Sequence, residues 1–212
     1  MSYFNTRFTK NHNREKVWAI FAPYLKKKFF LSGPILDVGS GYGEFIRHVG
    51  EGEKWALDLE PTLASHYADF GIRFVASPAG DLGSHLPKDY FGTIFSSNLL
   101  EHLSREEIMR FLQGARQCLQ PNGKLVIFMP NFKRAFREYY DDYTHTTALT
   151  EVSLSDMIAS SGFQVEFVHP GFMPYSVKDS RLPVNKILVW LWLSLPFKFF
   201  GKQMLVVARK SI

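Results

Sequence analysis

Three glycines at alternate positions, Gly39, Gly41 and Gly43, constrain the fold of this chain more than any other feature. The apolar run before them, residues 35–38, suits a buried strand, and residues 44–49 take up helical spacing. Glycine adopts positive φ and lets the backbone approach a ligand closely. A strand, a tight turn and a helix start of this kind commonly hold a nucleotide-like molecule.

The charges around the turn argue against a dinucleotide. A pyrophosphate-binding turn has the pattern G-x-G-x-x-G and seats the anion on free N–H groups at a helix N-terminus. Here Glu44 stands where the last glycine is expected, and Asp37 lies just before the turn. Both carboxylates would repel a pyrophosphate, but they suit a ligand with an ammonium group and a positively charged sulfur. The turn therefore predicts a cationic ligand.

A second acid follows at a suitable distance. Asp58 ends the next apolar run, residues 54–58, nineteen positions after Gly39 (58 − 39). In nucleotide-binding α/β folds, an acid about 20 residues after the first glycine lies at the tip of the second strand and accepts hydrogen bonds from the ribose hydroxyls. Asp58 fits that role.

With three further motifs, these residues resemble those of class I S-adenosylmethionine-dependent methyltransferases. The further motifs are Asp81 after a third short strand, residues 95–103 at the end of a fourth, and residues 121–127, with one glycine in place of the family's usual Pro-Gly-Gly. The resemblance spans roughly residues 33 to 169 and returns at 203 to 209. Because the motifs occur together, in the expected order and at workable spacings, the signal is specific.

The resemblance implies an α/β fold: a Rossmann-like, seven-stranded, mostly parallel sheet with an antiparallel last strand and helices on both faces. Hydrophobic runs place the strands at 35–38, 54–57, 72–76, 91–97, 124–129, 163–168 and 204–208. Helical spacing and end signals place the main helices at about 13–30, 42–49, 61–70, 105–119 and 150–162, with Ser104 capping the fourth.

The chain divides into two expected parts. Residues 1–32 would form a helical lid or cap, with a helix interrupted or tightened at Pro23. Tyr3, Arg7 and Phe8 would be part of that lid; a disordered tail is the alternative for them. Residues 33–212 would form the cofactor-binding domain, with a helical insertion at about 170–203 that is too long for a plain hairpin.

The resemblance also assigns the cofactor site. It implies that the turn binds the methionine end of the cofactor, that Asp58 binds the ribose, and that Asp81 accepts from the adenine amino group. For Asp81 a turn-capping role is the alternative. The expected cofactor-binding residues are Asp37, Gly39, Ser40, Gly41, Gly43, Asp58, Leu59, Asp81, Leu82, Ser97 and Asn98.

Two histidines are candidates for catalysis. A hydroxyl acceptor needs its proton removed by a positioned base, most often a histidine. We expect His145 to be that base, with Asp142 as its partner, because both lie in the loop past the fifth strand, where acceptors approach. His102 follows the fourth strand, where similar enzymes often carry a histidine; the alternative for it is a ring packed beside the cofactor.

A metal is not expected. In ubiquinone-pathway O-methyltransferases, the pattern E-x-x-E-H after the fourth strand is associated with a divalent metal. The chain keeps Glu101 and His102, but Asn98 stands at the position of the first acid.

The acceptor is expected to be a small molecule or a glycan. Residues 7–18 and 201–204 resemble bacterial methyltransferases associated with the biosynthesis of surface polysaccharides or lipid-linked glycans, which favours O-methylation of a sugar. The N-P-P-[YF] signature of many N-methyltransferases is missing after the fourth strand, which argues against methylation of nucleic acid or protein. A non-catalytic or membrane-associated binding protein with the same fold is the alternative from a different class.

Composition indicates a globular cytoplasmic protein. Cys118 is the single cysteine, which excludes a disulfide framework, and the N-terminus lacks the apolar core of a signal peptide. Residues 187–200 are apolar but too short and interrupted to span a bilayer. They would pack on the core, form a dimer contact, or lie on the inner face of a membrane with Lys186, Lys198 and Lys202 toward the headgroups. The sequence leaves the oligomeric state open.

Overall fold

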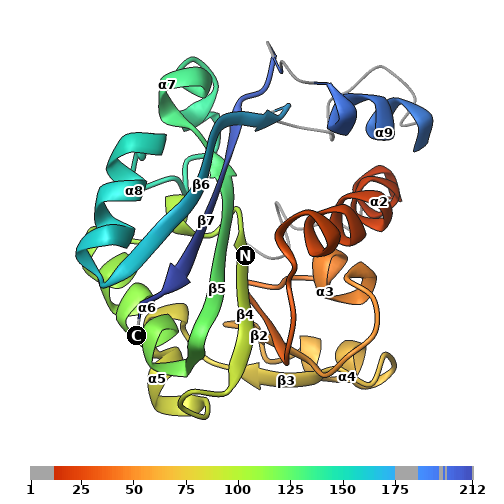
Figure 1. The fold of residues 1–212 in the computed structure, drawn as a ribbon, viewed down its shortest axis with the longest axis vertical. Coiled ribbons are helices and arrows are strands. Elements are labelled where there is room, and N and C mark those ends of the chain that lie inside the picture. The colour runs from red at the N-terminus through yellow and green to blue at the C-terminus, as the bar shows by residue number, and fades with distance from the viewer. Residues whose placement is uncertain (1–11, 175–185, 196–197, 199, 212) are drawn as a thin grey trace.

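The computed structural model describes residues 12–174, 186–195, 198 and 200–211, and the statements below concern those residues. One seven-stranded sheet, in the order β3-β2-β1-β4-β5-β7-β6, organises them (Figure 1). Strands β1 to β5 pair in parallel, and β7 runs antiparallel to both of its neighbours, β5 and β6. The predicted fold class is therefore confirmed. The strands are β1 (Ile35–Val38), β2 (Lys54–Asp58), β3 (Arg73–Ala76), β4 (Phe91–Ser97), β5 (Leu119–Pro130), β6 (Phe163–Met173) and β7 (Gln203–Lys210).

Helices cover both faces of this sheet (Figure 1). The α-helices are α2 (His12–Phe29), α3 (Glu44–His48), α4 (Leu63–Ala68), α5 (Leu82–His85), α6 (Arg105–Cys118), α7 (Phe132–Ala135), α8 (Glu151–Ser160) and α9 (Lys186–Ser194). Three short 3-10 helices are η1 (Ala79–Asp81), η2 (Leu100–His102) and η3 (Tyr139–Asp141). Helices α2, α3 and α4 lie on one side of the sheet, and α5, α6 and α8 lie on the other.

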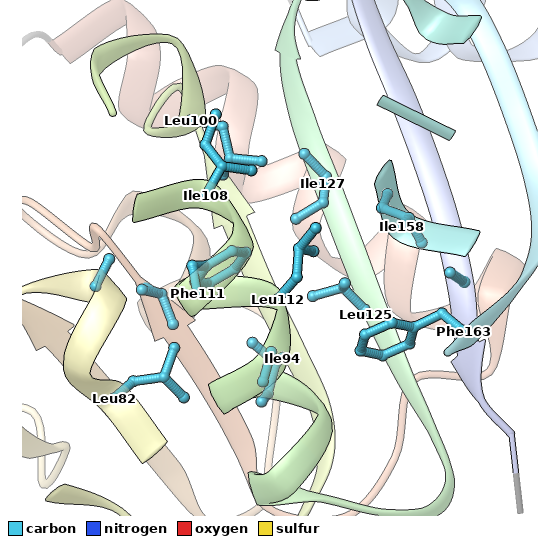
Figure 2. Packing of buried hydrophobic residues seen from close by; sticks show 14 of the residues in the cluster. Leu82, Ile94, Leu100, Ile108, Phe111, Leu112, Leu125, Ile127, Ile158 and Phe163 are labelled. Atoms are coloured by element: carbon cyan, nitrogen blue, oxygen red, sulfur yellow. The ribbon is translucent and has the colours of Figure 1, made fainter. Parts of the chain in front are cut away.

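The two faces bury different side chains. Figure 2 shows the aliphatic face, where Phe111 and Leu112 of α6 pack on Ile94 and Leu125 of the sheet. The opposite face is aromatic: Trp18 of α2 lies with its ring centroid 5.7 Å from that of Phe95. Since burial of large apolar side chains is the main favourable term in folding, the two clusters fix the helices that carry the site.

The predicted cap of α6 is confirmed. The Glu107 backbone N–H donates to the Ser104 hydroxyl at 3.2 Å, and the Ser104 N–H donates to the Glu107 carboxylate at 2.8 Å. This reciprocal pair satisfies two backbone donors that the first turn of a helix leaves without an intrahelical partner. It also fixes the end of the loop that follows β4.

Helix α2 is continuous, so the expected interruption at Pro23 is wrong. Pro23 is exposed, and water can satisfy the carbonyl that loses its N–H partner there. The helix begins beside the glycine turn, because Arg14 pairs with Glu44 at 3.3 Å and Glu15 with Arg47 at 2.7 Å. The division into a lid over 1–32 and a domain over 33–212 stays a prediction; Tyr3, Arg7 and Phe8 lie outside the described residues.

Strand β6 and the loop after β5 are more ordered than expected. Strand β6 continues five residues beyond its predicted end, to Met173, because Phe172 and Met173 are buried against the aromatic face. The stretch from 131 to 150, predicted as the loop past the fifth strand, contains α7 and η3, and Tyr139 at the start of η3 is fully buried.

Helix α9 packs on α2 through one side only. Val189 and Leu193 are buried, and the Trp192 indole N–H donates to the Phe172 carbonyl at 2.9 Å. Trp190 and Leu191 remain 61% and 47% exposed. The core-packing interpretation thus accounts for one side of the helix. Within the described residues, no helix combines the length and apolarity needed to cross a membrane.

Membrane contact through the exposed side of α9 stays a hypothesis with a direct test. If this side lies on a membrane, the protein should sediment with anionic vesicles, and Trp190→Ser should weaken that association. Indole and aliphatic side chains at the headgroup boundary supply most of the affinity of interfacial helices. Equal sedimentation with and without vesicles would remove the hypothesis.

Candidate functional site

The glycine turn adopts a backbone conformation that requires glycine. Gly39, Gly41 and Gly43 have φ values of 69°, 52° and 74°, in the left-handed region that other residues rarely adopt. The Gly41 N–H donates to the Asp58 carboxylate at 2.8 Å, and the buried Tyr67 hydroxyl donates to the Gly41 carbonyl at 2.8 Å. These bonds join the turn after β1 to the end of β2, as the sequence predicted for one site.

Buried negative charge surrounds this turn. Asp37 is 3% exposed, and burial, together with the nearby carboxylates of Glu44 and Asp58, raises its pKa well above the usual range. Burial also raises the pKa of Asp58, although backbone N–H groups oppose that shift. A cationic ligand would lower the cost of ionising these acids. The site therefore fits a sulfonium and an ammonium group, and it does not fit a phosphate.

The loop after β4 lies directly on the turn. A Cβ atom added to Gly39 would be 2.9 Å from Leu99 Cδ1, so this close approach also requires glycine. Asn98 has a positive φ of 50°, and its side-chain oxygen accepts from the Gln203 amide at 2.9 Å. Its Nδ2 donates to the Ser97 hydroxyl at 3.1 Å. Ser97 and Asn98 thus stand beside the glycine turn. Gln203 on β7 was not predicted as a site residue, because the resemblance of residues 201–204 assigns it no role at the cofactor.

Three further residues expected to bind the cofactor, Leu59, Asp81 and Leu82, differ in exposure. Leu59 is 71% exposed, and Asp81 is exposed at the end of η1. Leu82 is fully buried in the aliphatic core, in contact with α6 across Gly114. The Leu82 side chain therefore contributes to the core, and a contact of Leu82 with the cofactor stays a prediction.

The two candidate histidines meet although they lie far apart in the sequence. Their ring centroids are 4.8 Å apart in an edge-to-face arrangement. His145 is buried, and its Nδ1 lies 2.5 Å from the Tyr139 carbonyl. A carbonyl only accepts hydrogen bonds, so Nδ1 carries the proton and Nε2 the lone pair in neutral His145.

Asp142 lies between the two histidines in the hydrogen-bond pattern: its backbone carbonyl accepts from the His145 N–H at 3.1 Å, and its side chain is linked to His102. Its carboxylate accepts from the Thr144 hydroxyl at 2.6 Å, and that hydroxyl lies 2.9 Å from His102 Nδ1. Burial raises the pKa of Asp142, but the Thr144 hydrogen bonds and the two histidines outweigh it, so the pKa is lowered. A hydrogen-bonded chain thus runs from Asp142 through Thr144 to His102. The Asp142 carboxylate as the partner of His145 stays a prediction, and the charge of His145 contributes to the lowered pKa of Asp142.

Glu101 completes this cluster. Its side chain is 1% exposed, and its Oε2 atom has no hydrogen-bond partner among the described residues. Burial raises the pKa of Glu101 to about 8, with Asp142 adding to the shift. Burial also lowers the pKa of His102, and His145 lowers it further. A carboxylate oxygen and one ring nitrogen of each histidine lie within 4.8 Å of one another, and we call these three residues the His–Glu cluster.

The raised pKa of Glu101 predicts that the protein loses stability as the pH rises. A carboxyl with a higher pKa in the folded state stabilises the fold fully below the unfolded value of 4.5, and that contribution is lost as the pH rises to about 8. Asp37 acts in the same direction. At about 1.4 kcal/mol per pKa unit, the loss is on the order of a few kcal/mol.

Urea unfolding at pH 6 and pH 9, in buffer with a chelator so that no cation shifts the titration, measures this loss. Glu101→Gln should reduce the difference between the two pH values, whereas Glu106→Gln, which changes an exposed acid, should not. The same pH dependence in wild type and Glu101→Gln would contradict the assignment.

Comparisons with known proteins agree with this geometry. A family model described as a methyltransferase domain matches residues 11–167. No curated protein matches the chain in sequence. Many solved structures share the fold. An S-adenosylmethionine-dependent methyltransferase from Archaeoglobus fulgidus is 20% identical, with a TM-score of 0.68 over 91% of this chain and 94% of that one. A possible histamine N-methyltransferase from Thermotoga maritima is 15% identical, with a TM-score of 0.64 over 93% and 91%. The 1,6-didemethyltoxoflavin-N1-methyltransferase of Burkholderia thailandensis, bound to S-adenosylhomocysteine, is 17% identical, with a TM-score of 0.62 over 98% and 82%.

Proposed function

The chain belongs to the methyltransferase domain family, and from this membership we propose that it methylates a hydroxyl group of a small molecule or a glycan. Its cofactor is S-adenosylmethionine. The observation that carries the proposal is the His–Glu cluster. Two of its residues, Glu101 and His102, follow closely after Leu99, which covers the glycine turn.

The turn and its acids would hold the cofactor. Asp37 and Glu44 supply negative charge for the ammonium group, and Asp58 accepts from the ribose hydroxyls. Of the acids after β3, the exposed Asp81 is the candidate acceptor for the adenine amino group. When bound, S-adenosylmethionine supplies a methyl group on a positively charged sulfur, which makes the carbon electrophilic. The backbone of the turn and the neighbouring Ser40, Ser97 and Asn98 would orient it, because methyl transfer depends mainly on proximity and alignment.

The His–Glu cluster supports oxygen as the acceptor atom. A neutral amine can attack without first losing a proton, whereas a hydroxyl is a poor nucleophile until its proton is removed. Three titratable side chains gathered in one buried place suit that task. The cluster can promote loss of the proton in two ways: His145 can act as a base through Nε2, or the cluster can hold a cation that lowers the pKa of the hydroxyl.

Exposed aromatic residues support a ring-shaped acceptor. Phe136, Tyr140 and Tyr143 are 58%, 57% and 73% exposed on the segment between β5 and α8, which also carries His145. Aromatic rings stack on the apolar faces of sugars and equally on aromatic acceptors. We place the enzyme in polysaccharide biosynthesis on the strength of the terminal sequence resemblance, and we expect no contact with nucleic acid.

A panel of acceptors tests the proposal. The protein is incubated with S-adenosylmethionine and, separately, with nucleotide sugars, simple glycosides, catechols and primary amines, and S-adenosylhomocysteine is measured by mass spectrometry. Formation with a hydroxyl acceptor and not with amines is expected. Turnover with amines alone would contradict O-methylation. Cofactor binding without turnover on any acceptor would favour a non-catalytic binding protein.

A further inference from the structure

We propose that Glu101, His102 and His145 bind a divalent transition-metal cation, with Zn²⁺ as the ion that suits them best. No metal was expected from the sequence, because the chain keeps Glu101 and His102 of the E-x-x-E-H pattern but has Asn98 at the position of its first acid. The fold brings His145 to Glu101 and His102 from a loop more than forty residues away, so a third ligand comes from a different part of the chain.

The ligand atoms already lie close together. One carboxylate oxygen and one ring nitrogen from each histidine are all within 4.8 Å of one another. Around a tetrahedral zinc with bonds of about 2.0–2.1 Å, ligand atoms are roughly 3.4 Å apart. The three side chains would therefore need to approach one another by about 1 Å, which small side-chain rotations can supply.

A buried polar atom points to a ligand. Glu101 is only 1% exposed, and its Oε2 atom has no hydrogen-bond partner among the described residues. Leaving a buried carboxyl oxygen unsatisfied is unfavourable, because the oxygen loses its hydrogen bonds to water and gains none in the protein. A bound cation would remove that cost. Within a folded core, such an exception to hydrogen-bond satisfaction calls for a cause.

Both histidines are held through Nδ1, as metal-binding histidines usually are. His145 Nδ1 donates to the Tyr139 carbonyl at 2.5 Å, and His102 Nδ1 lies 2.9 Å from the Thr144 hydroxyl, which itself donates to Asp142. A carbonyl or carboxylate behind the ring fixes the tautomer that presents Nε2 as the ligand atom and makes it more basic. Asp142 thus becomes an outer partner of the metal site through Thr144.

The backbone around the cluster is fixed by further hydrogen bonds. The Glu101 carbonyl accepts from the N–H groups of Thr146 and Thr147 at 2.8 and 3.1 Å, and the Tyr139 hydroxyl donates to the Thr147 carbonyl at 2.7 Å. The loop of His145 is therefore tied to η2, which carries the other two ligands. A metal site needs this kind of support, because ligand geometry must be held within about 0.5 Å.

The donor set selects the class of cation. Two imidazoles and one carboxylate suit borderline ions such as Zn²⁺ and do not suit Ca²⁺ or Mg²⁺, which prefer oxygen ligands throughout. Two histidines and one glutamate are also a known ligand set of catalytic zinc, in which the fourth position is left to water or substrate.

A role in the reaction rests on the proposed function. The acceptor hydroxyl would take the fourth position, and the cation would lower its pKa. The hydroxyl proton passes to a solvent water, and the oxygen keeps the electron pair with which it bonds to the methyl carbon. The sulfur keeps the electrons of the bond that breaks. His145 then serves as a ligand in place of a base.

Cobalt(II) and zinc binding test the site without any activity measurement. The full chain, treated with a chelator and then freed of it, is titrated with Zn²⁺ by calorimetry and with Co²⁺ by visible absorption. We expect one ion per chain, with the cobalt band typical of four or five ligands. Glu101→Gln and His145→Gln should each weaken binding by at least 100-fold, and His85→Gln, at an exposed histidine of α5, should not change it.

Thr144→Val provides a milder variant in case the ligand substitutions disturb folding. It removes the hydroxyl behind His102 and should lower the affinity for the metal roughly 10-fold. Absence of binding in wild type, or the same affinity in wild type and both ligand variants, would overturn the proposal. Metal binding without methyl transfer would reject the proposed function alone, and full turnover in a chelator would reject the catalytic role of the cation.

Discussion

Replacing Asp58 with Ala should weaken the binding of S-adenosylmethionine by roughly 30- to 1,000-fold, which corresponds to about 2–4 kcal/mol. The carboxylate of Asp58 accepts from Gly41 N at 2.8 Å and from Glu60 N at 3.1 Å, so it both shapes the turn and would accept from the ribose. Hydrogen bonds to charged groups contribute about 1.5–3 kcal/mol each. Calorimetric titration of wild type and variant measures the difference.

The control for this experiment is Asp69→Ala, which removes the same charge from an exposed position after α4. Its affinity should stay within about twofold of wild type. Asp58→Asn, which keeps one acceptor oxygen, should lie between wild type and Asp58→Ala. If Asp58→Ala binds as tightly as wild type while retaining its melting temperature, Asp58 does not hold the ribose and the position of the cofactor must be revised.

Replacing His145 with Ala should lower the turnover number by roughly 10²- to 10⁴-fold, the range for loss of a group that promotes proton removal. The affinity for S-adenosylmethionine should change little, because His145 lies on the loop after η3 and the cofactor residues lie on the turn after β1. Loss of either a base or a metal ligand produces this result. Single-turnover kinetics with a hydroxyl acceptor distinguishes a slower methyl-transfer step from slower product release.

His85→Ala serves as the matched control, because His85 is exposed at the end of α5, away from the His–Glu cluster. Its turnover should equal that of wild type. A His145→Ala variant with unchanged turnover would remove His145 from the reaction. If turnover returns when Zn²⁺ is raised far above the wild-type requirement, the loss came from weakened metal binding rather than from a missing base.

Features set by neighbouring residues could be predicted from the sequence. The glycine turn, the capping box at Ser104 and the position of Asp58 each depend on a short pattern with a known backbone geometry. The order and direction of the strands followed from the resemblance. The expected interruption at Pro23 was wrong, since tertiary packing of Val17 and Phe21 keeps α2 continuous and an exposed proline costs less than a buried one.

Contacts between distant segments could not be predicted. Gln203 reaches Asn98 only because β7 inserts between β5 and β6, and a single sequence gives no signal for that hydrogen bond. The link from Asp142 through Thr144 to His102 was also not predicted: the carboxylate closes a local turn with Thr144, and only the fold brings His102 to that hydroxyl. Glu101 stands out in the sequence only as part of the E-x-x-E-H pattern. Its burial could not be predicted, because packing between distant segments decides whether a carboxyl is buried.

The buried acids at the glycine turn should affect how much of the protein accumulates in a cell. Burial raises the pKa of Asp37 and Asp58, so a chain that folds around these carboxyl groups is less stable empty than filled with a cationic ligand. A ligand that binds only the folded state stabilises it in proportion to the logarithm of its concentration. Proteases remove the unfolded fraction, so the amount of this enzyme should follow the supply of its own methyl donor. Scarcity of that donor would then reduce both the methyl-transfer rate of each enzyme molecule and the number of folded enzyme molecules.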